Sequence, residues 1–291
     1  MRRGSPGERT LPDRCGGHRP PTKRGAALLE CVVNVSTADD GSALAAMTRA
    51  AGDSLLDVHS DSDHNRSVLT MAGRDLEARV RAVAVVAIDR LDITGHVGAH
   101  PRIGALDVVP FVALDGASPE AAISARDAFA RWAGDALALP CFVYGPERTL
   151  PDVRRSAWVD LAPSFGPPVA HPTAGACAVG ARGVLVAYNL WLTDPDLMKA
   201  KAIASRLRGP AVRALGLRFA SHAQVSLNLV DPQRFGPAEA YDAVSALASI
   251  ARAELVGLLP RSVLGAIDAS RWDELDVGDD RTIEARLAAR A

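Results

Sequence analysis

The stretch that decides the fold is SLLDVHSDSDHNRSVLTMAG, residues 54–73. Its two apolar runs, 54–60 and 65–73, are separated by Asp and Ser, a pattern typical of two strands joined by a short loop. Upstream, the sequence predicts a strand at 28–36 and a helix at 40–51. Downstream, it predicts a helix at 74–92, where apolar residues recur at helical spacing, and a strand at 105–114. The resulting order is strand, helix, strand, strand, helix, strand, followed by a helix at 118–138 and a strand at 141–144.

The second half of the chain repeats this order. We predict a strand at 182–192, a helix at 194–208 capped by Asp194, hairpin strands at 211–220 and 222–231, a helix at 236–253 and a strand at 254–260. Two such units predict an α/β (α+β) fold of two facing βαββαβ-type subdomains, with helices on the outer faces and a substrate cleft between the sheets. The expected division is a disordered tail at 1–27, an N-terminal subdomain at 28–165 and a C-terminal subdomain at 166–291.

Composition narrows the class of protein. The first 26 residues hold 7 basic and 2 acidic residues, which leaves 26 basic and 32 acidic residues in the body of the chain. An acidic body argues against a general nucleic-acid binder. No apolar run reaches the roughly 18 residues of a membrane span, and the tail lacks the apolar centre of a secretory signal. The four cysteines form no CxxC pair, so we expect a cytoplasmic protein with reduced thiols.

A short phrase, Ala-His-Pro-x-x-Gly-Ala, occurs at 99–105 and again at 170–176. Pro101 favours an extended backbone at His100, and the surrounding glycines indicate a loop that opens onto a strand. A histidine held in this way suits general acid–base catalysis, because its ordinary pKa is about 6.5. The alternative is a structural or merely exposed histidine.

Three further patterns each allow two interpretations. The loop DVHSDSDHNR (57–66) gathers His, Asp and Arg, but its spacing matches no established metal-ligand pattern. The alternating Gln224, Ser226 and Asn228 share one face of a strand, which either lines the cleft or is an ordinary solvated face. The small residues of GACAVGAR (175–182) allow close approach of a ligand or simply form a tight turn before a strand.

Taken together, these stretches resemble the formiminotransferase family. The resemblance is carried in order along the chain by ECVVNVS (30–36), LLDVHSDSDHNRSVLTMAG (55–73), VGAHPRIGALDVVPFV (97–112), LAPSFGP (161–167), HPTAGACAVGARGVLVAYN (171–189) and QVSLNLVD (224–231).

The resemblance implies transfer of the formimino group from N-formimidoyl-L-glutamate to N5 of tetrahydrofolate, a step of histidine degradation, with His100 as the general acid and base. Tetrahydrofolate is then a co-substrate, and no metal is expected. The two Ala-His-Pro loops would come from different subdomains and meet at the cleft. The residues expected to bind the substrate are His59, Asn65, Arg66, Arg102, Arg182, Gln224, Ser226 and Asn228. The residues expected to contact folate are Gly166, Pro167, Pro168, Val169, Ala170, His171, Pro172, Thr173, Ala174 and Gly175.

Two other functions stay open at this point. One is cyclisation of 5-formyltetrahydrofolate at the same site. The other is folate binding without catalysis, because this chain has His59 where animal members of the family carry an aspartate and has His171, which they lack. The expected partners are the two small-molecule substrates, and a homodimer is one possible arrangement. We expect no nucleic-acid or membrane partner. A separate cyclodeaminase would carry out the next step.

Overall fold

A computed structural model describes residues 28–38, 41–98, 102–114 and 116–290, together with Met1. The expected tail lies outside these residues. The elements of the first half are β1 (Leu29–Val35), α1 (Gly41–Ala51), β2 (Leu55–Asp61), β3 (Arg66–Ala72), α2 (Leu76–Arg90), β4 (Leu106–Ala113), α3 (Pro119–Leu137), β5 (Cys141–Tyr144), α4 (Leu150–Ser156) and β6 (Cys177–Arg182). Those of the second half are β7 (Val186–Leu192), α5 (Leu197–Leu207), β8 (Val212–Arg218), β9 (Ala223–Leu229), α6 (Pro237–Ser245), β10 (Ile250–Val256), α7 (Arg261–Leu264) and α8 (Ile283–Ala288).

The strands form two sheets with the same internal topology. The first sheet has the order β2-β3-β1-β4-β6-β5 and the second the order β10-β7-β9-β8. Strand β1 is antiparallel to β3 and β4, as β7 is to β9 and β10. Each unit therefore has the ferredoxin-like βαββαβ arrangement, and the predicted fold class is confirmed. The first sheet is extended by β6 and β5, which run parallel to β4.

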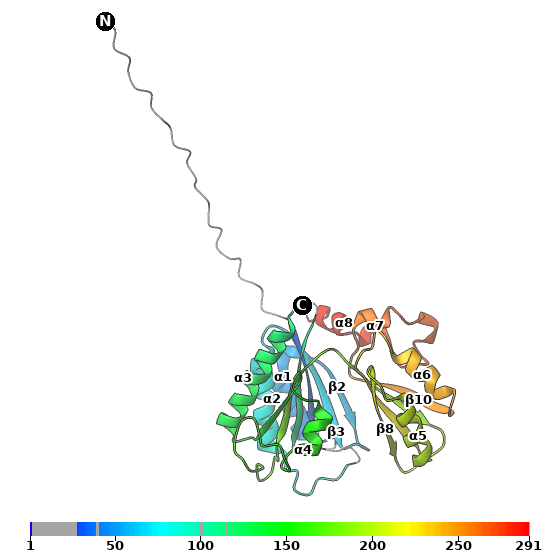
Figure 1. The fold of residues 1–291 in the computed structure, drawn as a ribbon, viewed down its shortest axis with the longest axis horizontal. Helices are drawn as coiled ribbons and strands as arrows, with labels where there is room; N and C mark the ends of the chain where they lie inside the picture. Colours follow the sequence, from blue (N-terminus) through cyan, green and yellow to red (C-terminus); the bar gives the residue numbers. More distant parts are fainter. Residues whose placement is uncertain (2–27, 39–40, 99–101, 115, 291) are drawn as a thin grey trace.

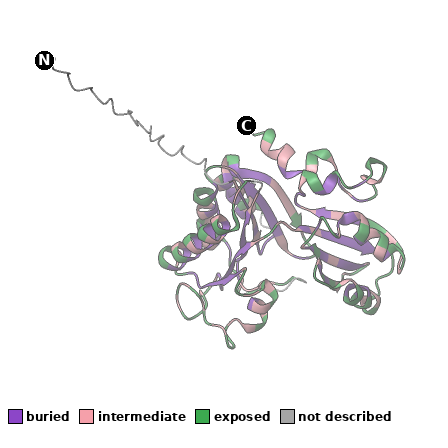
Figure 2. Cartoon of the chain, turned by 45° about the horizontal axis from the view of Figure 1, so that its top comes forward, coloured by how far each residue is buried: buried purple, intermediate pink, exposed green. Residues whose placement is uncertain are grey.

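The longer helices cover one face of each sheet, while the short helices α4 and α8 pack on parts of the opposite face of the first sheet. Apolar side chains of the first sheet, among them Val33, Phe111 and Val179, are buried against α1, α2 and α3. Those of the second sheet, such as Val225 and Leu227, are buried against α5 and α6. Figure 1 shows these longer helices on the outer sides, with the opposite faces of the two sheets turned toward each other. Figure 2 shows the sheets as the most buried layer of the molecule.

The structure contradicts the prediction of a helix over 236–253. Helix α6 ends at Ser245, and β10 begins at Ile250. The Ala-rich sequence favours a helix locally, but Ala253 and Leu255 are buried while Arg252 is exposed. This alternation suits a strand, and β10 pairs with β7 along its length. Tertiary pairing thus overrides helix propensity here.

Residues 175–182 also differ from the prediction of a turn before a strand. They contain β6, which lies between β4 and β5 in the first sheet. Small residues are required because a Cβ at Gly180 would lie 2.1 Å from the ring of Tyr144. The chain therefore passes from the first sheet to the second between Arg182 and Val186, and not at the expected subdomain boundary of 165/166.

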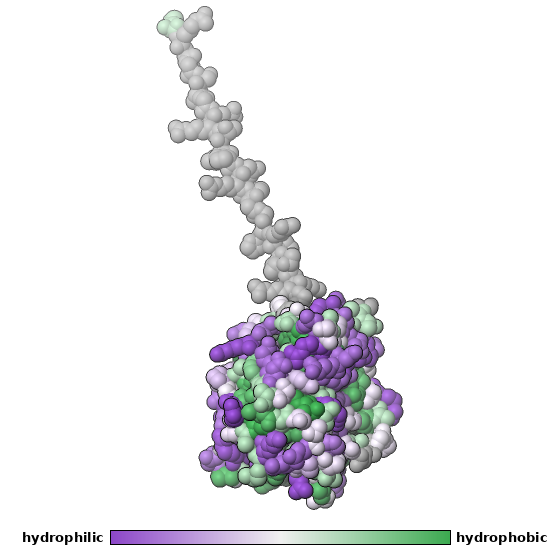
Figure 3. All heavy atoms as spheres, turned by 90° about the vertical axis from the view of Figure 1, so that its right-hand side faces the viewer, coloured by the Kyte–Doolittle hydropathy of each residue, from purple (hydrophilic) through white to green (hydrophobic). Residues whose placement is uncertain are grey.

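The predicted elements did not include α4, α7 or α8. The last of these brings the end of the chain back onto the first sheet, where Ile283 packs with Leu56 and Ala72. None of the helices in the described residues is long and apolar enough to cross a membrane. Figure 3 shows hydrophilic and hydrophobic side chains intermixed on the side of the second sheet.

Candidate active site between the two sheets

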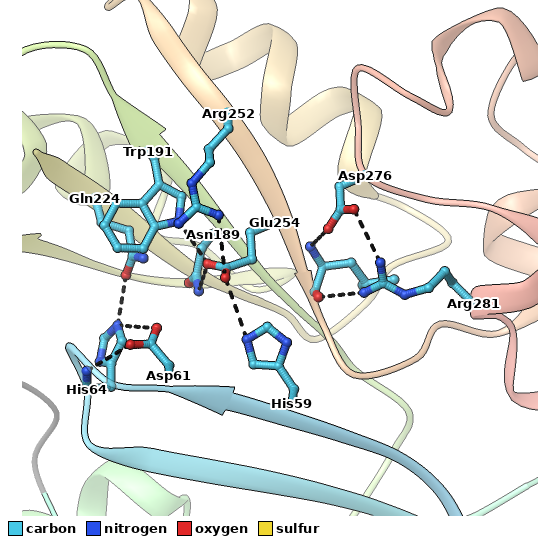
Figure 4. A network of polar contacts seen from close by, with 11 residues as sticks. His59, Asp61, His64, Asn189, Trp191, Gln224, Arg252, Glu254, Asp276 and Arg281 are labelled. Carbon is cyan, nitrogen blue, oxygen red and sulfur yellow. Dashed lines mark hydrogen bonds and ion pairs between the residues drawn. The ribbon is translucent and has the colours of Figure 1, made fainter. Parts of the chain in front are cut away.

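The uncovered face of the second sheet is polar, as the alternation of β9 predicted. Gln224 lies beside Trp191 and Ser226 beside Asn189 in the register of β9 with β7. The side chain of Gln224 points toward the first sheet, as Figure 4 shows, and its Oε1 lies 3.2 Å from Nε2 of His64. Gln224 is completely buried, Ser226 is half-buried and Asn228 is exposed.

Glu254 of β10 is the centre of a second contact between the sheets. Its Oε2 accepts hydrogen bonds from Trp191 Nε1 at 2.8 Å and Asn189 Nδ2 at 3.1 Å. Its Oε1 lies 3.6 Å from Nε2 of His59, which is on β2. Burial raises the pKa of Glu254, but these two hydrogen bonds and the charges of His59 and Arg252 outweigh it, so the pKa is lowered overall. Glu254 is thus held as a carboxylate opposite His59 (Figure 4).

The turn between β2 and β3 is connected to its surroundings by two adjacent residues. His64 donates its backbone N–H to Asp61 and packs edge-on against Phe219 of the second half. Asn65 has φ +44°, a left-handed conformation that asparagine tolerates. Its Oδ1 accepts from the Ala38 N–H at 3.0 Å, and its Nδ2 donates to the Val97 carbonyl at 3.1 Å. Both ends of the Asn65 amide therefore hold loops in place.

The two Ala-His-Pro phrases do meet, through backbone hydrogen bonds. Ala105 N–H donates to the Ala174 carbonyl, and Ala176 N–H donates to the Ile103 carbonyl, each at 2.9 Å. A Cβ at Gly104 would lie 1.8 Å from the Ala176 carbonyl oxygen, so only glycine permits this approach. Because β6 belongs to the first sheet, both loops belong to the first half, and the expectation that they come from different subdomains is wrong.

His100 lies outside the described residues, whereas the second loop is described. His171 exchanges backbone hydrogen bonds with Gly175, and its Nδ1 accepts from the Ala174 N–H at 3.1 Å. The segment 166–175, expected to contact folate, has mostly exposed or half-buried residues. It begins beside α3, where Gly166 contacts Gly134, and ends beside Gly104.

Two of the three predicted arginines lie near each other. Arg66 and Arg102 both experience the charges of Asp107 and Arg154. Arg102 contacts the His96 imidazole and donates to the His64 carbonyl at 3.4 Å. Arg182 lies apart, where its charge acts on Glu30, and it donates to the Gly183 carbonyl at 3.0 Å.

Arg66 has an unusual environment for a guanidinium. Its guanidinium forms no hydrogen bond or ion pair within the part of the chain that the structure describes, although its backbone pairs with Asp61 in the sheet. Burial lowers its pKa to about 10, and the charges of Arg154 and Arg102 add to this effect while Asp107 and Asp61 oppose it. A half-buried cation beside two further cations is a site that favours an anionic ligand.

Sequence reasoning missed several residues of this region. Arg154 and Asp107 form an ion pair of 2.7 Å, and Asn189, Trp191 and Glu254 form the network of Figure 4. The isolated Asp107 within the apolar run LDVVPF was a usable signal, because a charge in a buried strand requires a partner. Across 28–38, 41–98, 102–114 and 116–290, no three or more His, Cys, Asp or Glu side chains come together in a group that could hold a metal ion.

The geometry defines a two-sheet α/β protein with a polar layer between the sheets and an anion-favouring cluster at one end of it. Residues 28–182 match the formiminotransferase domain, N-terminal subdomain. The chain is 31% identical to a glutamate formimidoyltransferase of Streptococcus pyogenes serotype M1, over 85% of this chain and 93% of that protein. It is 30% identical to the glutamate formimidoyltransferase of Thermoplasma acidophilum, over 84% and 92%. It is 32% identical to the formimidoyltransferase-cyclodeaminase of Gallus gallus, over 85% of this chain but 52% of that protein. The chain belongs to the formiminotransferase family, a family of transferases.

Proposed function

We propose that the protein is a glutamate formimidoyltransferase that moves the formimino group from N-formimidoyl-L-glutamate to N5 of tetrahydrofolate, a step of histidine degradation. The observation that supports this proposal is Arg66, whose guanidinium forms no hydrogen bond or ion pair in the described residues and lies among the charges of Arg102 and Arg154. The donor carries two carboxylates, which are the ligands that a guanidinium binds best. Relatives that align over nearly their whole length carry the same activity in their names.

The reaction needs binding of two substrates and movement of protons. N5 of the folate forms a bond to the amidine carbon, giving a tetrahedral intermediate, and the bond from that carbon to the glutamate nitrogen then breaks. The attacking nitrogen loses a proton and the leaving nitrogen gains one. We assign both transfers to His100, which can act as base and then as acid. Holding the two substrates together supplies much of the remaining rate.

The other assigned residues divide between the two substrates. We place the donor at Arg66 and Arg102, with His59, Ser226 and Asn228 along the layer between the sheets. We place folate, the co-substrate, along 166–175, because this segment ends beside the loop that follows His100. Gln224 and Asn65 act by holding other groups, since their side chains already bind His64 and two loop backbones.

The variant Arg66→Gln tests whether the Arg66 guanidinium binds a carboxylate of the donor. The variant should raise the KM for formimidoylglutamate about 10-fold or more, because a charge-assisted hydrogen bond to a carboxylate is lost. The KM for tetrahydrofolate should stay within a few-fold. Formation of 5-formimidoyltetrahydrofolate is the measurement, and Arg155→Gln is the control because Arg155 is exposed. An absence of product with the unaltered protein would reject the proposed function itself.

His100→Ala separates catalysis from binding. General acid–base catalysis typically contributes about 10²–10⁴-fold, so kcat should fall by about that factor while folate affinity changes little. His171→Ala should mainly raise the KM for folate, because His171 orders the loop assigned to folate. The opposite pattern would transfer the catalytic role to the second loop, and a fully active His100→Ala would remove it from His100.

A further inference from the structure

Asp107 is a buried carboxylate, and both of its oxygens accept hydrogen bonds from the protein. Its side chain is 2% exposed, and that of its partner Arg154 is 16% exposed. Arg154 Nη2 lies 2.7 Å from Oδ2 and Nη1 lies 3.5 Å from Oδ1, so the guanidinium spans both oxygens. The Ile103 N–H donates to Oδ1 at 2.8 Å. The ion pair therefore links α4, β4 and the loop that contains Arg102.

The same carboxylate acts on Arg66. The charge of Asp107 raises the pKa of Arg66, whereas the charge of Arg154 lowers it. Asp107 is therefore close enough for its charge to act on Arg66, yet it forms its ion pair with Arg154. The guanidinium of Arg66 has no hydrogen bond or ion pair in the described residues.

We propose that Arg154 is a positioning residue that occupies both oxygens of Asp107 and thereby keeps Arg66 available for a carboxylate of the substrate. The inference rests on the proposed function and extends it, because it assigns a role to a helix that contributes no ligand. Without Arg154, Asp107 would be an uncompensated buried charge, which is strongly unfavourable. Arg66 would move to neutralise it and would no longer bind the substrate. Removing both charges together would free Arg66 again.

The test is a double-mutant cycle read by binding and by kinetics. Glutarate, a dicarboxylate without the amidine, is the binding probe, measured by calorimetry. Arg154→Gln should raise the Kd for glutarate and the KM for formimidoylglutamate about 10-fold or more. Asp107→Asn, which keeps an Oδ1 acceptor for the Ile103 N–H but removes the negative charge, should leave both unchanged or lower. The double variant should return to within about 3-fold of the wild type, since the two residues act through each other.

The neighbouring residue of the same helix gives the matched control. Arg155 is 71% exposed and pairs with Asp152, so Arg155→Gln should change neither constant. If Arg154→Gln does not fold, the glutarate affinity of Asp107→Asn tests the proposal by itself. A 10-fold weaker glutarate affinity in Asp107→Asn would overturn the proposal.

The outcomes also separate this inference from the proposed function. If the double variant binds glutarate as weakly as Arg154→Gln does, the ion pair is merely structural. That result would overturn the inference, even if the wild type transfers the formimino group. The glutarate Kd values of the variants could follow the predicted pattern while the wild type transfers no formimino group. That result would reject the proposed function but keep the dicarboxylate site. A wild type that does not bind glutarate would overturn the inference.

Discussion

Glu30 and Arg66 illustrate two ways in which the face of the first sheet that is turned toward the second sheet holds buried charge. Arg66 remains charged at neutral pH and is available to a ligand. Glu30, on β1, is 4% exposed. Burial raises its pKa to about 7, Arg182 opposes the shift and Glu284 adds to it. Because Glu284 comes from α8, the charge of Glu30 depends on the end of the chain that packs back onto this sheet.

Glu30→Gln should remove a pH dependence of stability. In the unfolded chain Glu30 releases its proton near 4.5, whereas in the folded protein it keeps the proton to about 7. Stability is therefore lost as pH rises through this window and is constant above it. The variant should be more stable than the wild type by up to about 3 kcal/mol above pH 7, and the difference should disappear below pH 4.5. Urea unfolding at several pH values measures it, and a pH-independent difference would contradict the raised pKa.

At the same scale, the sequence predicts those candidate site residues whose chemistry is visible locally. Arg66 and the face of Gln224 could be predicted from motif and alternation. Arg154 could not, because its role depends on Asp107, which is 47 residues away in sequence. Nothing in the local pattern of TLPDVRR distinguishes Arg154 from the exposed Arg155.

At the scale of elements, prediction succeeded where pattern and partner agree. The strands β2, β3 and β9 alternate or form short apolar runs, and each has a neighbour that suits that pattern. It failed at β10, whose Ala-rich sequence favours a helix until pairing with β7 is known. It also failed at β6, whose glycine and alanines indicate a turn until Tyr144 is placed over Gly180. In both cases the deciding contact lies in another part of the chain.

For the whole molecule, the important relation is the placement of one sheet against the other. His64 with Gln224 and His59 with Glu254 are polar contacts that join the two sheets. Both lie in the layer where the substrates are proposed to bind. The helices outside each sheet stabilise that sheet alone, so the relative position of the groups assigned to donor and folate depends on these contacts and on α8.

Gln224→Ala should therefore affect both stability and catalysis. It removes a buried hydrogen bond to His64, and the free energy of unfolding should fall by about 1–3 kcal/mol. The kcat/KM for both substrates should fall about 10-fold or more, because small displacements of reacting groups are costly. Gln233→Ala is the matched control, since Gln233 is exposed and bonds only Ser262 among the described residues; it should change stability by less than about 0.5 kcal/mol. Loss of stability with unchanged kcat/KM would show that the sheets keep their relative position without this contact, and that α8 and the contact of His59 with Glu254 suffice to align the two substrates.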